Sequence, residues 1–198
     1  MENLTSKEKE ILLVLLKDFS TNYNSRSIIK KVAITHPGAF KAMNRLAKNE
    51  LVVGKRMGHA VFYKVNLNDY CAFRIMEVLL ISEAKEKAGR WLYEFKDILA
   101  HAEAAVIFGS ILRNPQKAND IDILLVFKRE KNRIIDKLLE EKRTVSLKAI
   151  HINKQTPEDL MKNLINGDEV ILSALRTGYV LQGYEMLLKL IKDVTGKQ

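Results

Sequence analysis

The pattern of apolar and polar positions changes character near residue 104. Before it, most apolar residues recur every three or four positions, as in residues 6–18, and this period predicts amphipathic helices. After it, short continuous apolar runs such as 104–108 alternate with helical stretches, which predicts a layered α/β domain. Residues 69–101 lie between the two regions and predict a nearly continuous amphipathic helix with a break at Gly89.

These patterns predict a two-domain protein. We expect residues 1–68 and 102–198 to form separate domains, and residues 69–101 to link them. The first domain is predicted to contain helices and a hairpin, since Pro37 suits a first helical turn and a glycine-containing loop separates two β-rich runs. The helices are predicted over residues 6–18, 25–33 and 35–49, and the hairpin over strands 51–53 and 60–65 with the loop 54–59 between them.

The third predicted helix has an apolar face and a face rich in basic residues. A helix fits the major groove of DNA, where basic and amide side chains can contact phosphates and base edges. The basic loop of the hairpin could contact the DNA backbone beside it. The residues expected to face the core are Phe40, Met43, Leu46 and Ala47. The candidate DNA contacts are Lys41, Asn44, Arg45 and Lys48 on the helix and Lys55, Arg56 and His59 on the hairpin.

Charge strengthens this hypothesis. The 198-residue chain has a net charge of +9, from 33 basic and 24 acidic residues. Residues 26–64 alone hold nine Lys and Arg and one acid, Glu50, and so carry a net charge of +8. Such a concentrated basic segment favours a polyanionic partner, although a solvated lysine-rich face has the same composition.

Helices followed by a hairpin with a basic tip resemble a winged helix-turn-helix domain over about residues 5–66. The stretch NELVVGKRMGHAVFYKVN is similar to the place where the recognition helix of winged-helix transcription regulators ends and the wing begins. The resemblance implies double-stranded DNA as a partner. Two alternatives stay open: a winged helix that contacts proteins, and a helix over 69–101 that either links the domains or forms a homodimer.

In the second domain, strands and helices alternate. The informative segment is AAVIFGSILRNPQKANDIDI, residues 104–123. Asp120 and Asp122 enter a predicted strand two positions apart, so both carboxylates point to one face while Ile121 and Ile123 point to the core. The strands are predicted over 104–108, 120–127, 145–152 and 179–182, and the helices over 129–142, 156–166, 168–176 and 184–194.

Paired carboxylates suit Mg²⁺, a hard cation that takes oxygen ligands and shares its coordination shell with substrate phosphates. Gly109 ends the preceding strand and lets a phosphate approach the backbone. Ser110 would open a helix whose free N–H groups favour anions, and Arg113 could reach the same phosphates. These residues predict a site for a nucleoside triphosphate and its metal ion.

Phe108-Gly109-Ser110 and Asp120-Ile121-Asp122-Ile123 resemble the motif pair of the polymerase β nucleotidyltransferase superfamily, in particular its minimal stand-alone group. The segment GYVLQGYE, residues 178–185, is similar to a turn that closes this domain. The resemblance spans about 103–185 and implies a small mixed sheet flanked by helices. It also implies Mg²⁺-dependent transfer of a nucleoside monophosphate to nucleic acid, antibiotics or tyrosines of a small protein partner, with release of pyrophosphate.

One position departs from that family motif. The family has a third carboxylate on a later strand, and the corresponding residues here are Ile150-His151-Ile152. Three interpretations stay open: His151 replaces the acid as general base, the domain binds nucleotide without turnover, or the third strand has a different register.

The sequence also excludes several classes of protein. It has no stretch of 18 apolar residues and no apolar signal core, and its one cysteine, Cys71, permits no disulfide within the chain. We therefore expect a cytoplasmic protein without a membrane partner. The leading hypothesis is a DNA-binding nucleotidyltransferase. The alternative is an inactive transcription regulator whose second domain senses a nucleotide or binds another protein, as an antitoxin does.

Overall fold

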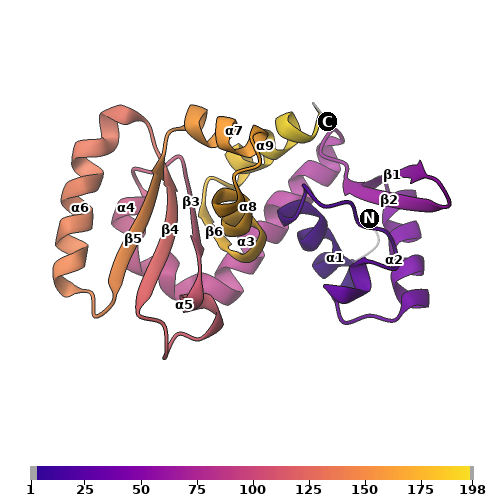
Figure 1. The fold of residues 1–198 in the computed structure, drawn as a ribbon, viewed down its shortest axis with the longest axis horizontal. Coiled ribbons are helices and arrows are strands. Elements are labelled where there is room, and N and C mark those ends of the chain that lie inside the picture. Colours follow the sequence, from indigo (N-terminus) through magenta and orange to yellow (C-terminus); the bar gives the residue numbers. More distant parts are fainter. Residues whose placement is uncertain (1–3, 197–198) are drawn as a thin grey trace. The chain divides into compact units, whose positions relative to one another are not determined.

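The computed structural model describes residues 4–196 (Figure 1). The chain divides into compact units, with a boundary between Leu79 and Leu80 inside the helix α3 (Tyr70–Glu94). The first unit precedes this boundary and also includes Thr195 and Gly196 at the end of the C-terminal helix, and the second runs from Leu80 to Val194. Each unit has its own set of buried apolar residues.

The first unit begins with α1 (Ser6–Lys17) and contains η1 (Ile28–Lys30), α2 (His36–Lys48), β1 (Val52–Met57) and β2 (Ala60–Val65). Thr5 starts α1 because its hydroxyl accepts the amide N–H of Glu8 while the Glu8 carboxylate accepts the amide N–H of Thr5. Apolar residues of α1 and α2 pack in the core of the first unit. The buried residues on these helices include Ile11, Leu12, Leu15, Leu16, Met43 and Leu46.

The predicted helix over 25–33 is wrong, because only a 3₁₀ turn forms there. The Asn24 side chain accepts the amide N–H groups of Arg26 and Ser27, and the Ser27 hydroxyl accepts the amide N–H of Asn24. These local bonds satisfy the backbone in a turn and so compete with a helix. Phe40 is also misassigned to the core, since it is 54% exposed on α2.

The hairpin is tighter than predicted. Its strands pair from Val52↔Val65 to Met57↔Ala60, so the expected six-residue loop shrinks to a turn at Gly58 and His59. Gly58 has φ 60° and holds the first central position of that turn, where glycine adopts positive φ most readily. A backbone bridge between Tyr23 and Tyr63 also ties the segment after α1 to β2.

The second unit is a mixed sheet with strand order β5-β4-β3-β6 and helices on both faces (Figure 1). β3 pairs antiparallel with β4 and β6, whereas β4 and β5 are parallel. Its strands are β3 (Ala104–Phe108), β4 (Asp120–Val126), β5 (Ala149–Gln155) and β6 (Tyr179–Gln182). Its helices after α3 are α4 (Lys96–Leu99), α5 (Ser110–Arg113), η2 (Arg129–Lys131), α6 (Asn132–Val145), α7 (Pro157–Ile165), α8 (Glu169–Thr177) and α9 (Tyr184–Gly196).

This architecture, a small mixed sheet flanked by helices, confirms the strand and helix order expected for the second domain. Some boundaries differ. The helix break follows Glu94 rather than Gly89, and β5 begins at Ala149, because Ser146 caps the turn before it by accepting the amide N–H of Lys148. Among residues 4–196, no helix is long and apolar enough to cross a bilayer.

The two faces of β4 lie in different surroundings. Ile121, Ile123 and Leu125 enter a core cluster with residues of α3, α4 and α6, as the two-residue period predicts. Asp120 and Asp122 therefore point to the opposite face, at the start of the strand. The same face is buried further along β4, where Leu124 is fully covered. The carboxylates thus lie at an open end of a sheet that is otherwise packed on both sides.

Candidate nucleotidyltransferase site

The turn from β3 into α5 favours glycine at position 109. Gly109 has φ 87°, a conformation that side chains disfavour. A Cβ atom added there would lie 2.2 Å from Asp122 Oδ2. Glycine therefore lets the backbone of this turn come close to the second carboxylate.

Ser110 follows this turn and has a role that sequence reasoning did not assign. Its hydroxyl donates a hydrogen bond of 3.1 Å to Asp120 Oδ1, so it orients the first carboxylate. The helix that Ser110 opens, α5, is a single turn of four residues. The expected anion site at its N-terminus consequently has little helix dipole behind it.

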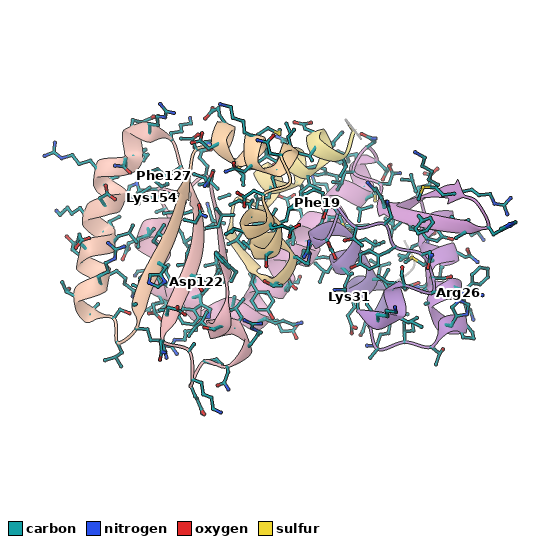
Figure 2. The ribbon with its side chains drawn as sticks, in the orientation of Figure 1. Phe19, Arg26, Lys31, Asp122, Phe127 and Lys154 are labelled. Carbon is teal, nitrogen blue, oxygen red and sulfur yellow. The ribbon has the colours of Figure 1, made fainter. Side chains whose placement is uncertain are left out.

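Three potential ligands converge from neighbouring strands. The parallel pairing of β4 and β5 sets Asp122 opposite His151. His151 Nδ1 lies 3.6 Å from Asp122 Oδ1 and 3.8 Å from Asp120 Oδ2. One ligand atom from each of the three residues lies within 4.8 Å of the others. Figure 2 shows Asp122 near one end of β4, whereas Phe127 lies beyond the other end of the same strand.

The electrostatics of this cluster favour a cation. Burial raises the pKa of Asp122, and the negative charge of Asp120 raises it further, while His151 lowers it in part. An ionised Asp122 is therefore under-compensated within the cluster. A bound cation would satisfy both carboxylates, whose oxygens are suitable ligands for a hard divalent ion.

A hollow of about 360 Å³ adjoins Asp120, the first of the two carboxylates. Arg113, which the sequence assigned to phosphate binding, lines it, and so does Lys117, which the sequence did not single out. The signal for Lys117 was its place in the loop between the two motifs. The hollow is lined by Ser110, Arg113, Asn114, Lys117, Ala118, Asn119 and Asp120.

The site can now be compared with known proteins. Residues 94–176 match the family model described as Polymerase beta, Nucleotidyltransferase. No curated protein and no solved structure matches the chain. The matched segment includes β3, β4 and β5 with the convergent residues, so it supports the nucleotidyltransferase part of the resemblance and indicates a nucleotidyltransferase-like function for the second unit.

The structure removes one of the three interpretations of the missing acid. Ile150, His151 and Ile152 all lie within β5, and His151 is paired with Asp122, so the strand register is as expected. The third position of the site is thus a histidine. Its side chain is 63% exposed. Two interpretations remain, a general base and a site that binds without turnover.

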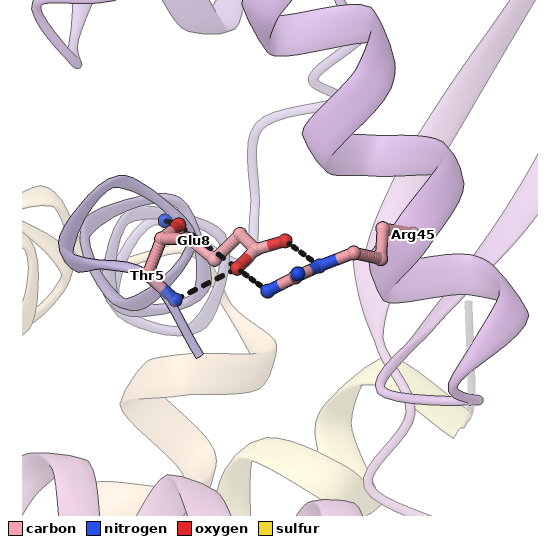
Figure 3. Close-up of polar contacts among 3 residues, drawn as sticks. All are labelled: Thr5, Glu8 and Arg45. Atoms are coloured by element: carbon pink, nitrogen blue, oxygen red, sulfur yellow. Dashed lines mark hydrogen bonds and ion pairs between the residues drawn. The ribbon is translucent and has the colours of Figure 1, made fainter. Parts of the chain in front are cut away.

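The candidate DNA contacts are arranged unevenly. Lys41, Asn44 and Lys48 are exposed on α2, but Arg45 donates through Nε and Nη2 to both carboxylate oxygens of Glu8 (Figure 3). This contact gives Arg45 a structural role in addition to the expected one. Lys55 and Arg56 lie on β1 rather than in a loop, and His59 lies in the turn. Adjacent strand residues point to opposite faces, so Lys55 and Arg56 face different sides of the hairpin.

Proposed function

We propose that the second unit transfers a nucleoside monophosphate from a nucleoside triphosphate to an acceptor hydroxyl, and that the first unit binds double-stranded DNA. The observation that supports the transfer most directly is the convergence of Asp120, Asp122 and His151 beside a basic hollow, inside the segment that matches the nucleotidyltransferase family model. The acceptor hydroxyl loses its proton to a base as its oxygen attacks the α-phosphorus, the bond from that phosphorus to the α,β-bridging oxygen breaks, and pyrophosphate leaves.

The residues of the site have distinct roles in this proposal. Asp120 and Asp122 hold a divalent cation, and Ser110 keeps Asp120 oriented for that task. Arg113 and Lys117 face the triphosphate charges from the hollow. Gly109 lets the backbone of the turn after β3 lie against the Asp122 carboxylate, with which a Cβ atom would collide. The cation, when bound, supplies charge neutralisation at the reacting phosphate.

Calorimetric titration of ATP, CTP, GTP and UTP tests the site, with and without a divalent cation. We expect cation-dependent binding in the wild-type chain and its loss in the double variant Asp120→Asn/Asp122→Asn. Asp136→Asn is a matched control, because it removes a carboxylate charge from α6, outside the convergent cluster. Binding that survives in the double variant, or that disappears equally in the control, would contradict the proposed site.

A second candidate function follows from His151. The carboxylate that the family motif has at this position activates the acceptor, and a histidine stands there instead. A domain that binds nucleotide without turning it over would act as a sensor within a transcription regulator. Cation-dependent binding combined with no release of pyrophosphate, for any nucleotide and with DNA or co-purifying protein offered as acceptor, would favour this function.

For DNA binding, the support is the basic surface of the first unit. Lys41 and Lys48 are exposed on α2, and Lys55 and Arg56 are exposed on the hairpin. Each phosphate contact releases counterions, so affinity should fall steeply with salt. We expect Lys41→Ala to weaken binding and to reduce the salt dependence, whereas Lys137→Ala on α6 should change neither. A wild-type chain without salt-dependent binding would overturn the DNA proposal.

A further inference from the structure

We propose that His151 is a metal ligand, and that the Asp120–Asp122–His151 site therefore takes a first-row transition-metal ion such as Mn²⁺ or Zn²⁺ in preference to Mg²⁺. This inference rests on the proposed function in one respect only, namely that Asp120 and Asp122 hold a divalent cation. It goes further by assigning the third ligand and the chemical class of the ion.

The geometry suits a shared ion. His151 Nδ1 is within 3.6 Å of Asp122 Oδ1 and 3.8 Å of Asp120 Oδ2. Ligands about 2.1 Å from one ion are about 3 to 3.5 Å apart at octahedral or tetrahedral angles. A small rotation of the imidazole ring would therefore complete the site, and the exposed ring is free to make it.

The backbone fixes this arrangement. Asp122 and His151 are opposite one another in the parallel pairing of β4 and β5, so the imidazole and the carboxylate extend from neighbouring strands. Ser110 orients Asp120 from the other side of the cluster. The nitrogen that lies close to both carboxylates is Nδ1, so a cation held by Asp120 and Asp122 has an imidazole nitrogen within reach.

The donor set decides which ion is preferred. A third carboxylate would make an all-oxygen site, which suits Mg²⁺. An imidazole changes the set to two oxygens and one nitrogen. Nitrogen donors favour transition-metal ions, whose affinities rise from Mn²⁺ towards Cu²⁺, whereas Mg²⁺ binds imidazole poorly. The substitution of one residue type at position 151 thus shifts the metal preference of the site.

The test measures metal binding to the full chain rather than activity. Mn²⁺ binding is followed by the loss of the free-ion electron paramagnetic resonance signal, and Mg²⁺ and Zn²⁺ are added as competitors. We expect Mn²⁺ to bind at least about tenfold more tightly than Mg²⁺, and Zn²⁺ to bind more tightly still. In His151→Asp the ratio of Mn²⁺ to Mg²⁺ affinity should fall by about tenfold.

Pulsed electron paramagnetic resonance of the Mn²⁺ complex gives a direct signature of the ligand. Coupling to a ¹⁴N nucleus is expected in the wild-type chain and absent in His151→Asp and His151→Ala. His101→Ala is the matched control, since His101 lies before β3 and outside the ligand group. It should keep both the coupling and the affinity ratio. Circular dichroism of each variant shows whether it is folded.

The possible outcomes separate this inference from the proposed function. Suppose that the ratio of Mn²⁺ to Mg²⁺ affinity is the same in the wild-type chain and in His151→Asp, and that no ¹⁴N coupling is seen. The inference is then overturned, while the metal site at Asp120 and Asp122 stands. If no divalent ion binds, or binding survives in Asp120→Asn/Asp122→Asn, the metal-dependent part of the proposed function fails and this inference fails with it.

Discussion

Glu8 in the first unit and Asp122 in the second are carboxylates in opposite situations. The Glu8 side chain is 3% exposed, and burial opposes its ionisation. Hydrogen bonds from Arg45 and Thr5 nevertheless outweigh that effect, so the pKa of Glu8 is lowered. The Asp122 side chain is 26% exposed, yet its pKa is raised by burial and by the charge of Asp120. Glu8 is thus the more deeply buried of the two carboxylates, and its negative charge is also the better compensated.

The difference distinguishes a carboxylate that stabilises the fold from one that is poised for a ligand. Every partner of Glu8 described above comes from the first unit itself. The guanidinium of Arg45 makes a bidentate contact with the Glu8 carboxylate (Figure 3). Asp122 faces another carboxylate and an exposed histidine, and it adjoins a turn in which any residue other than glycine would be strained. A native chain keeps such an under-compensated cluster where a bound group supplies the missing charge.

Arg45→Ala should give the largest effect on stability. It leaves Glu8 buried without its cationic partner, which destabilises a protein by about 2 to 4 kcal/mol when the pair is partly accessible. Hydrogen exchange of the α1 and α2 amides in the full chain measures this loss within the first unit. Arg26→Ala is the matched control, because Arg26 is exposed outside the helices, and it should change protection very little. Equal effects in the two variants would contradict a stabilising role for the Glu8–Arg45 pair.

The second-largest loss of stability is expected for Gly109→Ala, in the second unit. The positive φ strains any side chain, by about 1 to 3 kcal/mol, and the added Cβ collides with Asp122. We expect lower stability and at least a severalfold loss of divalent-cation affinity. Fluorescence of Trp91, the single tryptophan of the chain, reports unfolding of this unit. Gly89→Ala in α3, where a Cβ atom meets nothing within 4 Å, should instead be neutral or stabilising.

Acidification should affect the first unit in a definite direction. Because the pKa of Glu8 is lower in the folded state than its ordinary value of 4.5, ionised Glu8 stabilises the fold above that value. The contribution is lost as pH falls through the lowered pKa. The expected loss is smaller than in Arg45→Ala, since a protonated Glu8 keeps hydrogen-bonding groups near Thr5. Exchange of α1 amides between pH 6 and pH 3 measures it, and Glu8→Gln should flatten that dependence.

Much of the second unit could be predicted from local sequence, and less of the first. The strand before Gly109 is a continuous apolar run, and the strand after it opens with alternating aspartates and isoleucines, so the strand order and the shared face of Asp120 and Asp122 were predictable. The Asn24 turn could not be distinguished from a helix by apolar spacing alone. The Glu8–Arg45 contact joins residues 37 positions apart, and nothing in either helix pattern indicates it. Likewise, the hydrogen bond from Ser110 to Asp120 depends on how β3 and β4 pair.

Asp122→Asn should give the smallest effect and the opposite sign to Arg45→Ala. It removes a charge whose ionised form is disfavoured beside Asp120, so the metal-free second unit should become slightly more stable at neutral pH, by less than about 1 kcal/mol. The sign follows from the raised pKa: a folded state that holds its proton more tightly loses stability as pH rises through that pKa. Denaturant unfolding followed by Trp91 fluorescence, with a chelator present, measures the change. The gain should vanish at low pH, where wild-type Asp122 is protonated. A loss of stability at neutral pH would mean that His151 already compensates Asp122 without any bound cation, and the contrast with Glu8 would no longer hold.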